Sequence, residues 1–209
     1  MSIQRINLLG TLLFMSALAF ILFVISVLQT KNLFFMGLNW NLFLAWIPVF
    51  LALYVEKKDS EISVSVISII WLLFFPNAPY IITDLVHLTP QGGNLYWHHQ
   101  IMIFSYAFVS LACGLLSLYW MQRVWTRVFS QRISFWAGLV SIGLSGYGIF
   151  LGRIERLNSW DLFVHPFSLV RLMLHSARSF TAILMTVEFS LFIGLAYWMF
   201  YSLLRFKDE

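Results

Sequence analysis

The sequence predicts an all-α polytopic integral membrane protein, a helical bundle that forms a single domain over residues 1–209. Composition is the first observation that predicts this class. Hydrophobic residues make up 60% of the chain and charged residues 11%, whereas soluble domains have roughly 45–50% and about 25%. The second observation is that six apolar segments approach the roughly 20 residues that a helix needs to cross a bilayer. We therefore expect the lipid bilayer to surround most of this chain.

We expect six transmembrane helices. The expected spans are Leu8–Leu28, Leu33–Val55, Ile62–Ile82, Ile101–Met121, Ile133–Leu151 and Phe180–Leu204. The first span is too long and too uniformly apolar for a cleaved signal peptide, so we expect it to remain as an anchor.

The third span is expected to be broken near its end. Pro79 has no amide hydrogen, and Pro76 disfavours helical geometry in the residue before it. We expect the helix to break near Phe75 and to release backbone carbonyls at membrane depth. Such carbonyls need partners, and Asn77 and Thr83 are suitable ones.

The fifth span carries a face of small residues. They recur at three- and four-residue spacing, as Gly138, Ser141, Ser145, Gly148 and Gly152. A face with so little side chain lets another backbone approach closely. It would hold the following arginines against a neighbouring helix, such as the broken third one.

An amphipathic helix is expected between the fifth and sixth spans. After Pro166, a polar stripe of Ser168, Arg171, His175 and Arg178 faces away from an apolar one. This pattern predicts an interfacial helix that lies along the membrane surface, or a lid over a polar site.

The distribution of basic residues predicts the orientation. With six spans, eight Lys and Arg residues fall on the side of both termini and five on the other. The positive-inside bias then predicts cytoplasmic termini. Basic residues placed between apolar runs suit anionic headgroups, so nucleic acid is not an expected partner.

Two polar strings close the third and fifth spans, and the threading puts both on the side opposite the termini. Residues 75–87 include Asn77, Asp84 and His87, and Asn41 enters the second span at the same side. The second string supplies Arg153, Glu155, Arg156, Asn158 and Asp161. We expect these residues to form one shared site.

The residue types suggest two kinds of chemistry. Arg153 and Arg156 could clamp a carboxylate, phosphate or lipid headgroup, or could neutralise neighbouring carboxylates. Asp84 and His87 stand three residues apart, so in a helix they share a face and could act as an acid/base pair or as ligands. Whether the protein is an enzyme stays open.

Metal binding is a weaker possibility. Asp84 and His87, together with His98 and His99, are metal-capable side chains. Their spacing is not specific, and histidines beside aromatic residues also fit an interfacial belt. The sequence assigns no metal site and no cofactor.

Glu188 lies about eight residues into the sixth span. An ionisable group at this depth is costly, so we expect it to face the interior of the bundle. It would pair with Arg153 or Arg156, or share a hydrogen bond in its protonated form. We include it among the candidate ligand-binding residues.

Three motifs resemble a bacterial membrane family known as domain of unknown function 1361. They are the segments Asn41–Pro48, Phe75–Leu88 and Leu151–Asp161. The resemblance implies a multi-helix integral membrane protein of bacterial origin, and so a place in the bacterial inner membrane with both termini cytoplasmic. It implies no particular activity. The matching motif positions are Asn41, Asn77, Asp84, His87, Arg153, Arg156, Asn158 and Asp161.

The favoured functional hypothesis is a polar pocket at the extracytoplasmic face that binds or acts on a small polar or lipid-headgroup ligand. A transporter is the first alternative, because a broken helix and a buried carboxylate can build a midplane site. A structural partner of another membrane protein is the second.

Overall fold

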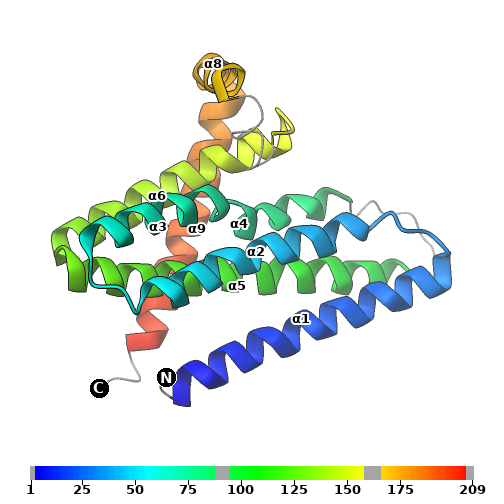
Figure 1. The fold of residues 1–209 in the computed structure, drawn as a ribbon. Coiled ribbons are helices and arrows are strands. Elements are labelled where there is room, and N and C mark those ends of the chain that lie inside the picture. The colour runs from blue at the N-terminus through cyan, green and yellow to red at the C-terminus, as the bar shows by residue number, and fades with distance from the viewer. Residues whose placement is uncertain (1–2, 88–94, 158–165, 206–209) are drawn as a thin grey trace.

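The computed structural model describes residues 3–87, 95–157 and 166–205. These residues form helices with short connections, and they include no strand (Figure 1). The elements are α1 (Ile3–Thr30), α2 (Met36–Val55), α3 (Glu61–Phe74), α4 (Asn77–Tyr80), η1 (Ile81–His87), α5 (Tyr96–Val128), α6 (Gln131–Arg153), α8 (Pro166–Ser176) and α9 (Phe180–Arg205).

Six of these segments are long and apolar enough to cross a membrane, which confirms the predicted class and span count. They are Arg5–Thr30, Met36–Val55, Glu61–Val86, Tyr96–Val128, Gln131–Arg153 and Phe180–Leu204. The largest difference from expectation is α5, which has 33 residues instead of the 21 from Ile101 to Met121. At 1.5 Å per residue it is about 50 Å long. Its polar ends remain helical because they pack against neighbouring helices.

Helix α5 forms the centre of the bundle. It contacts α1, α2, α3, α4, η1, α6 and α9. Trp71 of α3 stacks on Phe75 with ring centroids 4.5 Å apart, and its indole N–H donates to Ser117 of α5 at 3.2 Å. These buried aromatic contacts fix α3 and its broken end against α5.

The break after α3 is confirmed. Helix α3 ends at Phe74, a single turn follows as α4, and the chain continues as the 3₁₀ helix η1. The carbonyl of Phe74 accepts from Asn77 Nδ2 at 3.0 Å, and the carbonyl of Tyr80 accepts from Thr83 Oγ1 at 2.7 Å. Both expected side chains therefore satisfy backbone groups released by the break.

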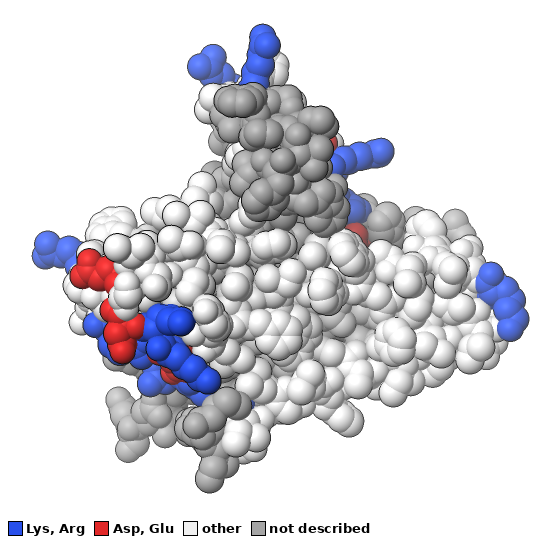
Figure 2. Space-filling view, viewed as in Figure 1, with Lys and Arg blue, Asp and Glu red and all other residues white. Residues whose placement is uncertain are grey.

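The bundle has two ends with different chemistry. At the terminal end, α1, α3 and α6 begin, while α2, α5 and α9 end (Figure 1). At the motif end, η1 and α6 end, and α2 and α5 begin. Charged side chains gather at one end of the surface, and the broad face between the ends is mostly uncharged (Figure 2). This distribution agrees with helices that lie in a bilayer.

The predicted amphipathic helix is present as α8, seen end-on beyond α6 in Figure 1. Tyr147 of α6 donates its hydroxyl to the carbonyl of Met173 at 2.6 Å, which ties α8 to the bundle. Arg171 and His175 are exposed, as the polar stripe predicts, but Leu174 of the apolar stripe is also 69% exposed. Helix α9 then returns along α6, its main neighbour.

Candidate functional site

The two polar strings meet at the motif end. Arg153 Nη1 donates to Asp84 Oδ1 at 3.1 Å, and Asn41 Nδ2 donates to Asp84 Oδ2 at 3.3 Å. The three side chains come from α6, η1 and α2. We call Asn41, Asp84 and Arg153 the motif cluster. One residue of each string is thus brought into contact, and a site shared by the remaining string residues stays a prediction.

Asp84 is the most enclosed member of the motif cluster. Its side chain is 10% exposed and that of Arg153 is 24% exposed. A carboxylate withdrawn from water needs a cation and hydrogen-bond donors to remain charged, and Arg153 and Asn41 supply both. Of the two roles expected for the arginines, Arg153 therefore has the second, which is to neutralise a neighbouring carboxylate.

Small residues of α6 let the broken segment approach closely. A Cβ atom at Gly148 would lie 2.8 Å from Pro76 Cβ, and one at Gly152 would lie 3.0 Å from the Tyr80 ring. Both distances are shorter than ordinary contacts, so a side chain at either position would force its neighbour to shift. The expected close-packing face of α6 thus meets the break after α3.

A cavity of about 580 Å³ lies beside the motif cluster. Its lining residues come from α2, α3, α4, α6 and α8, and they are Asn41, Leu44, Ile69, Ile70, Leu72, Leu73, Pro76, Asn77, Tyr80, Leu144, Tyr147, Gly148, Leu151, Gly152, Leu157 and Met173. The wall is mainly apolar, with the amides of Asn41 and Asn77 and two tyrosines as its polar groups. Asn41 belongs to both the cavity and the motif cluster.

The end of α6 has an unusual backbone. Arg156 adopts φ 57°, the left-handed region, and the N–H of Leu157 donates to the carbonyl of Leu151 at 3.1 Å. This bond closes the helix end in the way that a glycine-based cap usually does. Arg156 is exposed. Neither it nor Glu155 takes part in the described contacts of the motif cluster.

Other predicted site residues cannot be placed in the cluster. Asn158 and Asp161 lie outside the described residues. The backbone of His87 ends η1, but its side chain is also outside them. The predicted contact between Asp84 and His87 therefore stays a prediction.

The expectation that Glu188 faces the interior is wrong. Its side chain is exposed on α9, and the described ion pairs of Arg153 do not include it. Its neighbours on the same exposed stripe are Leu184 and Leu191. The opposite face of α9, at Ser190, is the one that packs on Gly146 of α6.

The two adjacent histidines at the start of α5 contact α1. His98 Nε2 lies 3.0 Å from the carbonyl oxygen of Leu22, and His99 Nε2 lies 3.0 Å from Ser26 Oγ. Within the described part of the chain, no three His, Cys, Asp or Glu residues are grouped in a way that could hold a metal ion.

Comparison with known proteins adds a family to this geometry. The family described as Protein of unknown function (DUF1361) matches residues 40–197. The chain belongs to the DUF1361 family. That region contains all three members of the motif cluster and the whole lining of the adjacent cavity. No curated protein and no solved structure matches this DUF1361 chain.

Sequence reasoning missed several residues around the site of this DUF1361 protein. Tyr106 of α5 donates its hydroxyl to Asn39 Oδ1 at 2.6 Å, next to the start of α2. Tyr80 and Tyr147 line the cavity. A tyrosine in an apolar helix needs a partner for its hydroxyl, and this requirement was the available signal.

Proposed function

We propose that the cavity at the motif end binds a small polar or lipid-headgroup ligand. The observation that carries this proposal is the position of Asn41. Its side chain lines the cavity and is held by Asp84, which is held in turn by Arg153. A ligand site of this kind has mainly apolar walls with a few fixed polar groups that set orientation.

Each residue has a role in the proposal. Asn41 and Asn77 contact the polar part of the ligand, because their amides are the ones that line the cavity. Asp84 and Arg153 position Asn41. We assign Glu155, Arg156, Asn158 and Asp161 to the mouth of the site, since they follow Arg153 in the same string. If the ligand is a substrate, Asp84 and His87 are the proposed pair for proton transfer.

The location of the site is part of the proposal. We place the protein in a bacterial inner membrane, and the excess of basic residues on the side of the termini supports cytoplasmic termini. The motif end would then face the extracytoplasmic side. The transporter and partner-protein alternatives stay hypotheses, and no feature of the described residues favours either over a binding site.

A cavity-filling experiment tests the proposal. Leu144 lines the cavity and is 47% exposed, so Leu144→Trp fills space without opening the core. Val140 is on the same helix, is 55% exposed and lines neither cavity, so Val140→Trp is the matched control. We expect mass spectrometry of material released from purified protein to find a small molecule near one per chain in the wild type and in Val140→Trp.

The same molecule should be lost in Leu144→Trp and in Asn41→Leu. Each variant is first checked for an unchanged melting temperature. Retention of the molecule in Leu144→Trp, or its absence from the wild type, would argue that the motif cluster has only a structural role.

A further inference from the structure

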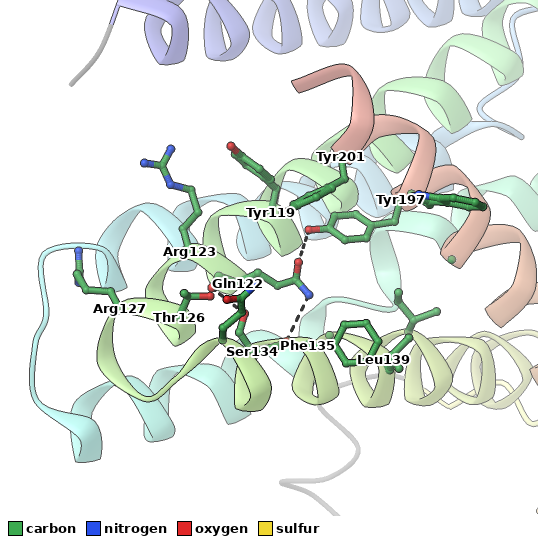
Figure 3. A pocket seen from close by; sticks show the side chains of 15 residues that line it. Tyr119, Gln122, Arg123, Thr126, Arg127, Ser134, Phe135, Leu139, Tyr197 and Tyr201 are labelled. Atoms are coloured by element: carbon green, nitrogen blue, oxygen red, sulfur yellow. Dashed lines mark hydrogen bonds between the residues drawn. The ribbon is translucent and has the colours of Figure 1, made fainter. Parts of the chain in front are cut away.

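A second cavity lies at the opposite end of the bundle. It has a volume of about 860 Å³ and lies between α5, α6 and α9 (Figure 3). Its lining residues are Tyr119, Gln122, Arg123, Thr126, Arg127, Gln131, Ser134, Phe135, Gly138, Leu139, Ile142, Gly194, Tyr197, Trp198 and Tyr201. None of them lines the cavity at the motif end. We call this space the terminal cavity.

One wall of the terminal cavity is a fixed hydrogen-bond network. Tyr197 donates its hydroxyl to Gln122 Oε1 at 2.6 Å, and Gln122 Nε2 donates to the carbonyl of Ser134 at 3.3 Å (Figure 3). A Cβ atom at Gly138 would overlap the Gln122 amide, so the glycine leaves room for it. The polar wall is therefore held in place by three helices before any ligand arrives.

Two arginines stand at the rim of the terminal cavity. The guanidinium of Arg123 lies 5.9 Å from the centroid of the Tyr119 ring. Arg127 donates to the backbone carbonyls of Glu56 and Lys58 at 2.7 and 3.0 Å, which anchors it at the helix ends. Guanidinium groups bind phosphate oxygens with well-defined geometry. Arg127 also lies 3.5 Å from Asp59, so Arg123 is the guanidinium of this rim that suits an anion with phosphate chemistry.

The rest of the terminal cavity is apolar and opens sideways. Phe135, Leu139 and Trp198 are 56%, 46% and 70% exposed. These residues lie on α6 and α9, and both helices are long and apolar enough to cross a membrane. Their exposed side chains would therefore face lipid. A ligand that enters from this direction has to be soluble in the membrane. Free inorganic phosphate would leave the apolar part of the cavity unfilled.

We propose that the terminal cavity binds one anionic phospholipid. The phosphate lies against Arg123, with the polar wall at Gln122 beside it. An acyl chain follows Leu139 and Trp198. Because Tyr197 and Tyr201 of α9 contact Gln122 and Tyr119 of α5 at this cavity, the lipid also ties α9 to the centre of the bundle.

Native mass spectrometry of the full chain in detergent tests this proposal, with phosphatidylglycerol and phosphatidylcholine as probes. We expect one tightly bound phosphatidylglycerol per chain and a higher melting temperature in its presence. Phosphatidylcholine should bind at least tenfold more weakly. Equal binding of the two lipids would overturn the proposal. Displacement of phosphatidylglycerol by millimolar inorganic phosphate would also overturn it, because the site would then recognise a soluble anion.

Two pairs of variants separate this site from general surface attraction. Arg123→Gln should weaken phosphatidylglycerol about tenfold, the loss expected when one charge-assisted hydrogen bond is removed. Arg132 is exposed at the same end and does not line the cavity, so Arg132→Gln should change nothing. Equal losses in both variants would mean that the lipid is held by diffuse charge, which contradicts the proposal.

Leu139→Trp fills the terminal cavity and should abolish binding of the lipid while the helical circular dichroism signal is kept. Leu144→Trp, at the other cavity, is its matched control, because the two leucines are 46% and 47% exposed. Leu144→Trp should retain the lipid. The two leucine variants thus test the terminal cavity and the motif-end cavity separately.

Discussion

Two arginine–carboxylate pairs, one at each end of the bundle, differ in their exposure. At the terminal end, Arg127 and Asp59 lie 3.5 Å apart with side chains 45% and 89% exposed. At the motif end, Arg153 and Asp84 lie 3.1 Å apart and are 24% and 10% exposed. Water screens the first pair and is largely kept away from the second. The Arg127–Asp59 pair therefore acts as surface charge, whereas the Arg153–Asp84 pair is an internal ion pair that joins α6 to η1.

The largest expected effect comes from breaking the enclosed pair. Asp84→Ala leaves Arg153 without this carboxylate and removes the acceptor of Asn41. We expect a loss of about 3 kcal/mol in the free energy of unfolding, measured by denaturant titration in detergent. Asp59→Ala, at the terminal end, should cost less than about 1 kcal/mol. Comparable losses at the two ends would remove the distinction between them.

A double-mutant cycle sharpens this result. Arg153→Met, alone and combined with Asp84→Ala, measures the coupling between the two side chains. The double variant should be more stable than the sum of the two single losses predicts. Additive losses would mean that the pair contributes nothing as a pair.

The next largest effect tests the close approach of α6 to the break. Gly148→Ala places a methyl group 2.8 Å from Pro76 Cβ, and such overpacking costs about 1–3 kcal/mol. Gly143 is on the same helix, and a methyl group added there would have no neighbouring atom within 4 Å, so Gly143→Ala should be neutral or stabilising by up to about 1 kcal/mol. Melting temperatures of the two variants check this, and equal behaviour would contradict the packing.

A smaller effect concerns backbone strain at the motif end. Arg156 and Lys31 have φ values of 57° and 53°. A residue with a Cβ atom destabilises the folded state by about 1–2 kcal/mol in this region. Glycine avoids this strain, although it loses more conformational entropy on folding. Arg156→Gly and Lys31→Gly should each raise the free energy of unfolding by up to about 1 kcal/mol. A clear loss in Arg156→Gly alone would show that its side chain holds the end of α6.

The smallest expected effect is the pH response of the terminal end. A hydrogen bond from Arg5, together with the nearby positive charge, lowers the pKa of Glu56 below its ordinary value of 4.5. A carboxyl group with a lowered pKa in the folded state stabilises the protein above pH 4.5. That contribution is lost as the pH falls through the lowered pKa.

Melting temperatures measured from pH 6 down to pH 3 test this prediction. Because Glu56 is 31% exposed, we expect a change below about 1 kcal/mol. Arg5→Gln should flatten the response over this range. An unchanged profile in Arg5→Gln would show that other groups cause the acid response.

The sequence by itself determined the class of this protein, its six spans and the break near Phe75. It also determined that the two polar strings share one end, because helices that cross a bilayer in alternation leave few choices for where each string falls. These conclusions follow from length, composition and proline chemistry, which act locally. The tertiary structure was needed for the pairing of Asp84 with Arg153, 69 residues apart, and of Asp84 with Asn41, 43 residues apart.

The tertiary structure also decided which face of each helix points inward. In water, an apolar stripe marks the buried face, but lipid is as apolar as the interior, so this signal is weak in a membrane. Glu188 illustrates the consequence, since its depth along α9 could be read from the sequence and its outward direction could not. Each cavity depends on which way its helices are rotated about their own axes, because its lining comes from at least three helices. Each also depends on the close packing at a glycine, Gly138 for the terminal cavity and Gly148 for the motif-end cavity.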